Sequence, residues 1–197
     1  MFSSVSIEHE VSGISMLPTY NDNVGNQKDI VYVNTFDHDY AINDIIVFTK
    51  DKTSIIKRVI GLPGDIIDIV SVNNEYRLER NGKIIQEDYI YIDDRPTTPS
   101  NNQSGLYVTH DNFTKSLMNS HPELFNEQGK LVVPEISVFV LGDNRHRSED
   151  SSLIGTISFE QIEGKVELVR RYNESQFDFY WDYIVTGKFF KTLVNIF

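Results

Sequence analysis

The sequence predicts a mainly β protein in which a β core is interrupted by an inserted cap region of mixed α and β structure. Apolar and polar side chains alternate in segments such as 5–11, which is typical of a half-buried strand. Asn81-Gly82 separates two further strand-like stretches, and this pair favours the type I′ turn of a β-hairpin. The chain contains one clear helix candidate before its last quarter, at residues 111–119.

The remaining elements follow from local patterns taken in chain order. Apolar runs bounded by turn residues predict strands at 29–33, 44–48, 54–60, 65–72, 137–141 and 162–169. The hairpin is expected to join 75–80 to 83–86. Segment 93–105 is rich in Pro, Thr, Ser and Asn, which predicts a loop. The helix is expected to start at Thr109 or Asp111 as its cap and to stop near Pro122.

These elements divide the chain into three parts. We expect the β core at 1–72 and 131–172, the inserted cap at 73–130 and an aromatic C-terminal tail at 173–197. The tail is rich in Phe, Tyr and Trp and carries two lysines, Lys188 and Lys191. It is expected either to pack on the core or a partner chain, or to contact a membrane interface.

Composition excludes several classes of function. The 197 residues carry a formal net charge of −11, which argues against nucleic-acid binding, since that needs a basic face. The absence of cysteine removes disulfides, a thiol nucleophile and thiolate metal sites. No apolar run approaches the roughly 18 residues that a membrane-spanning helix needs.

Three short stretches carry the chemistry. In 12–19, Gly13 permits close approach and Pro18 biases Leu17 towards an extended backbone, so Ser15 is expected where a strand ends. By itself this would be an ordinary surface serine. The other stretches are Lys57-Arg58-Val59-Ile60-Gly61-Leu62-Pro63-Gly64-Asp65 and Gly142-Asp143-Asn144-Arg145.

Together these stretches resemble the sequence boxes of the bacterial type I signal peptidases, membrane-anchored serine proteases that use a Ser/Lys dyad. Residues 15–19 match the family's Ser-Met-x-Pro-Thr, and residues 57–65 match its lysine box. Residues 142–151 match its last box, and Gly155 matches the glycine that follows. The boxes occur in the family's order and span about three quarters of the chain.

The resemblance implies a role for individual residues. Ser15 would be the nucleophile, Lys57 the general base and Ser148 the residue that hydrogen-bonds and orients the lysine. The backbone N–H of Ser15 would donate to the oxyanion. Gly13 stands where some members carry a further hydroxyl donor, so that donor is missing here.

Elementary chemistry sets the requirement on Lys57. A lysine acts as a base only when neutral, and its ordinary pKa of about 10.4 must fall to about 7–8. In a strand, Ile55 and Val59 share the face of Lys57 while Arg58 points to the other face. Apolar neighbours without an adjacent cation therefore predict that burial lowers the pKa of Lys57.

Asp143, Arg145 and Asp150 match polar positions that support the site in the family. Ser152 stands where the family has an arginine that pairs with the equivalent of Asp150. We therefore expect Asp150 either to pair with Arg145 or Arg147, or to be more exposed than in relatives, because a buried unpaired carboxylate is costly.

The implied substrates are signal peptides of exported precursor proteins, cut after small side chains at the first and third positions before the bond. Such a peptide would lie extended against the strand edges at 11–14 and 54–57. Candidates for its binding site, each of which could also be ordinary core, are Val11, Gly13, Met16, Tyr20, Ile55 and Ile56. No metal or other cofactor is expected.

The resemblance also implies a bacterial cell membrane location, with the catalytic part on the extracytoplasmic side. The family's anchor lies just before the nucleophile box. No such anchor is present in this chain, and we expect that it was removed rather than that the protein lacks one.

Three alternatives remain open. The first is a Ser/His/Asp triad, for which only His9 and His146 of five histidines lie near the boxes. The second is a self-cleaving repressor-type Ser/Lys protease, which the acidic charge disfavours. The third is a non-catalytic signal-peptidase-like protein that binds precursors during surface-fibre (pilus) assembly. Members of that kind usually lose the nucleophile or the lysine, whereas this chain keeps both.

Overall fold

A computed structural model describes residues 6–21, 28–73, 75–91 and 110–179. Most strands form one seven-stranded sheet in the order β1-β2-β11-β3-β4-β9-β10, and every neighbouring pair in it is antiparallel. The strands are β1 (Ser6–Glu10), β2 (Ile30–Asn34), β3 (Ile45–Lys50), β4 (Thr53–Gly61), β9 (Ser137–Leu141), β10 (Ile157–Ser158) and β11 (Ile162–Arg170). The mainly β class expected from the sequence is confirmed.

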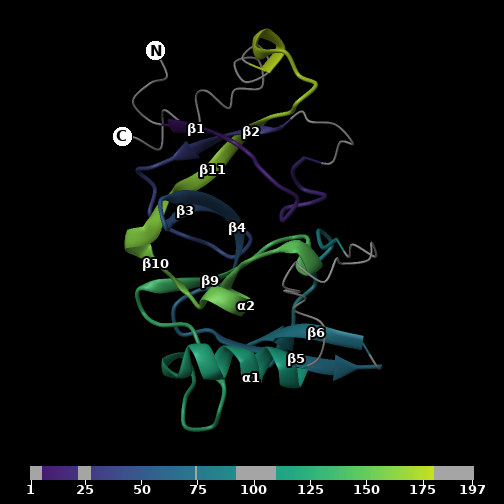
Figure 1. Cartoon of the computed structure of the whole chain (residues 1–197), viewed down its shortest axis with the longest axis vertical. Coiled ribbons are helices and arrows are strands. Elements are labelled where there is room, and N and C mark those ends of the chain that lie inside the picture. Colours follow the sequence, from purple (N-terminus) through teal and green to yellow (C-terminus); the bar gives the residue numbers. More distant parts are fainter. Residues whose placement is uncertain (1–5, 22–27, 74, 92–109, 180–197) are drawn as a thin grey trace.

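A second, four-stranded sheet lies at the opposite end of the molecule from β1 and β2 (Figure 1). Its order is β7-β6-β5-β8, formed by β5 (Ile66–Val72), β6 (Glu75–Arg80), β7 (Lys83–Ile84) and β8 (Leu131–Val132). Helix α1 (His110–Ser120) packs against β5, and the short helix α2 (Ser151–Ile154) lies between α1 and β9. Single 3-10 turns occur at Pro122–Leu124, Arg145–Arg147 and Phe159–Gln161.

Two tight turns explain the hairpins. Asn81 and Gly82 have φ angles of 53° and 75°, which confirms the predicted turn between β6 and β7. Asp51 and Lys52 adopt φ angles of 50° and 67° between β3 and β4, although neither is glycine or asparagine. Aspartate tolerates this left-handed region better than most residues, and the paired strands hold the turn in place.

Three buried apolar clusters hold these layers together. One fills the space between the smaller sheet, α1 and β9, and includes Ile69, Leu117 and Phe139. The other two lie on opposite faces of the larger sheet, because side chains alternate along β4. Ile55 and Val59 therefore join one cluster, whereas Ile56 joins the cluster beneath the loop of Ser15.

The predicted strands are all present within two residues of their expected ends. The helix starts at His110, so Asp111 lies inside its first turn and is not its cap; Thr109 and the predicted loop at 93–105 lie outside the described residues. The smaller sheet joins β5 and β8, from the expected core ranges, to β6 and β7, from the expected cap. The division into core and cap stays a prediction.

The C-terminal tail is described only as far as Phe179. Its ring stacks on Tyr32 of β2 with centroids 5.1 Å apart and is 6% exposed. The predictions for residues 180–197 fall outside the described residues. Within the described ranges, no helix has both the length and the apolar character needed to cross a membrane.

Candidate active site

Ser15 and Lys57 meet at the edge of the larger sheet. Ser15 lies in the turn after β1, and Lys57 lies in the middle of β4. The Lys57 Nζ atom is 2.8 Å from Ser15 Oγ and donates a hydrogen bond of 2.8 Å to the carbonyl of Ile56. β4 pairs with β9 only from Arg58 onward, so residues 53–57 present one strand edge that no described strand covers.

The environment of Lys57 shifts its protonation equilibrium towards the neutral amine. Lys57 is 3% exposed, and its burial lowers its pKa from 10.5 to about 8. The negative charges of Asp150, Asp143 and Glu149 oppose this shift without cancelling it. Removal from water is thus the dominant cause, as the apolar neighbours in β4 indicate.

The predicted hydrogen bond between Ser148 and Lys57 is not formed in this structure. The lysine amine is directed instead to Ser15 and Ile56. Ser148 is 1% exposed, and its Oγ is buried without a hydrogen-bond partner. It packs against Gly142, where an added Cβ would lie 2.2 Å from Ser148 Oγ and 2.6 Å from the carbonyl oxygen of Ser15. Only glycine therefore permits Ser148 and the loop of Ser15 to approach β9 this closely.

Asn144 fastens the loop of Ser15 to the end of β9. Its backbone N–H donates to the carbonyl of Ser15 at 2.9 Å, and its Nδ2 donates to the carbonyl of Ile14 at 3.1 Å. The residue is fully buried. No role was assigned to Asn144 from the sequence. Its position inside the last matched box was the signal that could have identified it.

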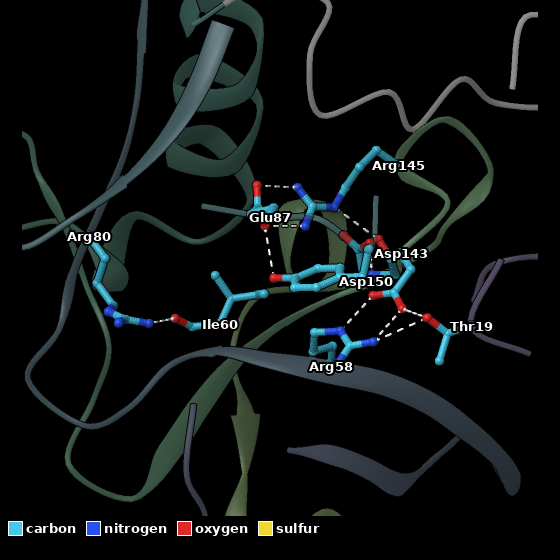
Figure 2. A network of polar contacts seen from close by, with 10 residues as sticks. Thr19, Arg58, Ile60, Arg80, Glu87, Asp143, Arg145 and Asp150 are labelled. Carbon is cyan, nitrogen blue, oxygen red and sulfur yellow. Dashed lines mark hydrogen bonds and ion pairs between the residues drawn. The ribbon is translucent and has the colours of Figure 1, made fainter. Parts of the chain in front are cut away.

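Arg58 and Asp143 form a buried ion pair beside the dyad (Figure 2). The guanidinium donates two hydrogen bonds to the carboxylate, of 2.8 Å from Nε and 2.6 Å from Nη2. Thr19, at the end of the nucleophile box, donates to the same carboxylate and accepts from Arg58 Nη2 at 3.2 Å. Because Arg58 follows Lys57 in β4, this pair ties the loop of Ser15 to the strand that carries Lys57.

Arg145 pairs with Glu87, a residue that sequence reasoning missed (Figure 2). Both guanidinium ends donate to the Glu87 carboxylate, and Arg145 Nε donates to the carbonyl of Gly142 at 3.0 Å. Tyr89 donates to Glu87 at 3.1 Å, and its ring centroid lies 4.0 Å from the guanidinium carbon of Arg58. No motif or periodicity marks Glu87, because its role depends only on contact in space.

Asp150 is satisfied without a cation. Its carboxylate accepts from the backbone N–H of Gly142 at 2.9 Å and of Ser152 at 3.2 Å, and from the hydroxyl of Ser152 at 2.7 Å. The residue is 2% exposed and caps α2. Among the described residues, neither Arg145 nor Arg147 pairs with it. Both expectations for Asp150 were therefore wrong, because the serine that replaces the arginine supplies two of the donors itself.

A pocket of about 340 Å³ opens beside the dyad, between the end of β1 and the uncovered edge of β4. Of the predicted substrate residues, Val11, Ile55 and Ile56 line it. Met16 and Tyr20 are instead buried in the core beneath the loop, and Gly13 is exposed outside the pocket. The rest of the lining comprises Ser15 and Lys57 themselves with His9, Glu10, Ser12, Val31, Val47, Thr53 and Ser54.

A second polar network holds the loop of Ser15 from behind. Asn21 Nδ2 donates to the carbonyls of Val11 at 2.8 Å and Gly13 at 3.2 Å. The buried carboxylate of Asp29 accepts from the backbone of Asn21 at 2.8 Å and from Arg171 at 3.0 Å. Arg171 is 142 positions from Asp29, and nothing in the sequence pattern pointed to this network.

The hydrogen bonding of Ser15 Oγ gives no support to the histidine alternative. Its hydrogen bond is to Lys57, whereas His9 lies 3.0 Å from Glu163 on β11. In the described part of the chain, no group of three His, Cys, Asp or Glu side chains is arranged to hold a metal ion.

Known proteins share sequence with this chain over most of its length. A family model described as signal peptidase, peptidase S26, matches residues 1–170. Signal peptidase I V of Bacillus subtilis (strain 168) is 32% identical over 168 residues, which cover 83% of this chain and 85% of that protein. Signal peptidase IB of Staphylococcus aureus (strain COL) is 32% identical over 159 residues, covering 80% of this chain and 74% of that protein.

A crystal structure of a signal peptidase I from Enterococcus faecalis V583 aligns with 66% of this chain and 97% of that chain, at 29% identity and a TM-score of 0.43. The assignment depends on the family model, which spans most of the chain, and on the sequence relatives. On that basis the chain belongs to the signal peptidase family S26.

Proposed function

We propose that this chain removes signal peptides from exported precursor proteins, as a serine endopeptidase in which Ser15 is the nucleophile and Lys57 the general base. The observation that carries the assignment of roles is the 2.8 Å contact between Ser15 Oγ and a lysine amine that is 3% exposed. A serine needs an adjacent base, and a lysine serves as one only where burial makes its neutral form accessible.

The reaction proceeds in two halves, which are acylation of Ser15 and hydrolysis of the resulting ester. Neutral Lys57 accepts the proton of Ser15 Oγ as that oxygen bonds to the scissile carbonyl carbon. The ammonium then protonates the leaving amine, the C–N bond breaks and the signal peptide remains as an ester on Ser15. A water molecule gives its proton to Lys57 and attacks the ester, and the proton returns to Ser15 as the acid product departs. The backbone N–H of Ser15 stabilises the oxyanion in both halves.

The pocket suits an extended peptide. Residues 53–57 of β4 offer an uncovered strand edge, to which a peptide backbone can add hydrogen bonds. Val11, Val47 and Ile56 give the pocket an apolar wall beside Ser15. A modest pocket bounded by β-branched side chains favours small substrate residues near the cleaved bond. Ser148 packs against Gly142 at the end of β9. Asp143, Arg145 and Asp150 support the loops that carry the dyad.

The location follows from the same function. The family is membrane-associated, and we place the catalytic part on the extracytoplasmic side, where exported precursors present their signal peptides. A non-catalytic role in binding precursors for fibre assembly is not favoured, because the chain retains both Ser15 and Lys57 and brings them into hydrogen-bonding distance.

The test is cleavage of a peptide that spans a signal-cleavage junction, with the product mapped by mass. Ser15→Ala and Lys57→Met are each expected to reduce kcat/KM by at least about 1000-fold, because each removes a reacting group. Lys52→Met and Ser71→Ala, at exposed positions in the neighbouring turn and on β5, are the matched controls and should retain activity. Normal cleavage by a folded Ser15→Ala protein would refute the assignment.

A further inference from the structure

We propose that Asn144 is a positioning residue that aims the backbone N–H of Ser15 at the oxyanion. The proposal rests on the function above. Asn144 does not touch the reacting atoms in this arrangement. It acts by fixing the two peptide groups that flank the Ser15 Cα.

The geometry of one peptide group carries the argument. The carbonyl of Ile14 and the N–H of Ser15 belong to the same planar peptide unit, in which a trans bond directs them to opposite sides. Asn144 Nδ2 donates to that carbonyl at 3.1 Å, and the backbone N–H of Leu17 donates to it at 3.2 Å, so Asn144 adds a side-chain restraint on the direction of the Ser15 N–H. The backbone N–H of Asn144 holds the next carbonyl, that of Ser15, at 2.9 Å. One residue therefore restrains both φ and ψ of the nucleophile.

Asn144 is itself held in place. The carboxylate of its neighbour Asp143 takes two hydrogen bonds from Arg58, and the backbone carbonyl of Asp143 accepts from Tyr91 at 2.8 Å. The carbonyl of Asn144 accepts from Arg147 at 3.1 Å. Arg58 adjoins Lys57 in the chain, and Asp143 adjoins Asn144. The ion pair of Arg58 and Asp143 therefore positions both the base and the N–H of the nucleophile.

The side chain of Asn144 is incompletely satisfied. Asn144 is fully buried, and its Oδ1 has no hydrogen-bond partner. A buried acceptor without a partner costs about 1–3 kcal/mol, and most buried polar groups avoid this cost. An apolar residue would fill the space without that cost, but it could not hold the Ile14 carbonyl. Gly13 has no side chain that could supply a second donor to the oxyanion. Stabilisation of the oxyanion therefore depends more strongly on the direction of the Ser15 N–H.

Asn144→Ala is the central variant, and Asn21→Ala is its matched control. Asn21 holds the carbonyls of Val11 and Gly13 in the same loop but does not contact the peptide group of Ser15. Loss of one oxyanion donor lowers kcat by about 100- to 1000-fold, and misdirecting a donor should cost less. We expect Asn144→Ala to lower kcat about 10- to 100-fold, with KM within about twofold of the original value and the pH at half-maximal rate unchanged.

A peptide aldehyde provides a second readout. When Ser15 Oγ adds to the aldehyde carbon, the former carbonyl oxygen occupies the oxyanion position. Asn144→Ala should weaken aldehyde inhibition by the same factor as kcat, whereas an uncleavable peptide without the aldehyde should bind unchanged. Asn21→Ala should weaken aldehyde inhibition less than Asn144→Ala does. Equal losses for both variants, or a loss confined to KM, would overturn the proposal.

A measurement on the unaltered protein covers the case in which Asn144→Ala does not fold. In NMR spectra, the donated side-chain amide proton of Asn144 should exchange slowly with solvent, and the Ser15 amide should shift downfield when the aldehyde binds. A rapidly exchanging Asn144 amide contradicts the proposal. Inactive Ser15→Ala together with a normal kcat for Asn144→Ala would refute this inference alone, whereas active Ser15→Ala would refute the proposed function.

Discussion

At the scale of single residues, the proposed mechanism makes the reactivity of Ser15 depend on the charge of Lys57. The amine is nearly removed from solvent, and burial brings its pKa down to about 8. The reacting form is the neutral one, whose fraction grows as the pH rises through that pKa. The nearby carboxylates raise the pKa and so keep it from falling further.

We therefore predict that kcat/KM rises with pH through an inflection near 8 and is level at higher pH. The rise has this sign because protonated Lys57 cannot accept the serine proton. The measurement is a pH–rate profile on the junction peptide, with thermal denaturation at each pH to exclude unfolding. An inflection near 6.5, the ordinary histidine value, would instead indicate a histidine base.

At the scale of elements, α2 and the end of β9 depend on one carboxylate. Asp150 caps α2 and also accepts from the backbone N–H of Gly142, directly after β9. Its oxygens would be left short of donors if the hydroxyl of Ser152 were lost. The serine at this position thus has a structural role of its own, different from that of the arginine expected from the family pattern.

Ser152→Ala is predicted to lower the free energy of unfolding by about 1–3 kcal/mol, because a buried carboxylate loses a charge-assisted hydrogen bond. Urea denaturation at neutral pH measures this change. Leu153→Ala, at the next position of α2 and 38% exposed, is the control and should cost less. A Ser152→Ala protein no less stable than the control would mean that Asp150 is adequately held by backbone donors.

At the scale of the whole molecule, a short segment from Glu87 to Tyr91 connects the smaller sheet to the active site. Glu87 binds Arg145, Tyr89 lies against Arg58, and the backbone of Tyr91 pairs with Asp143 and Arg145 on both sides of Asn144. Two residues separate the segment from the end of β7, so the smaller sheet and the loops of the dyad are mechanically joined. Figure 2 shows Glu87 facing Arg145, with Arg58 and Asp143 nearby.

We predict that Glu87→Gln destabilises the protein by about 2–4 kcal/mol and also lowers kcat. Removing one partner of a buried ion pair typically costs about 3–5 kcal/mol, and the remaining amide oxygen recovers part of it. Denaturation and kinetics are measured in parallel, with Asp88→Asn as the control at an adjacent exposed carboxylate. The double variant Glu87→Gln/Arg145→Met should lose less than the sum of its parts, and additive losses would contradict direct coupling.

The sequence by itself determined the strands, the β6–β7 turn and the two residues that we propose react. Strand alternation and Asn81-Gly82 are local properties, so they can be recognised without knowing the fold. Ser15 and Lys57 stand in short matched boxes, and the apolar neighbours of Lys57 in β4 already predict a lowered pKa.

Only the tertiary structure decided which partners those boxes meet. Glu87 pairs with Arg145 across 58 positions, and Asn144 reaches Ile14 across 130. No local pattern encodes such contacts, because they arise where separate strands end at a common edge. Contacts between distant parts of the chain also explain why Ser148 and Asp150 have surroundings other than those predicted. Ser148 packs against Gly142, while the amine of Lys57 is directed to Ser15. Asp150 accepts hydrogen bonds from Ser152 and Gly142. Buried polar groups bind the partners that packing brings within reach.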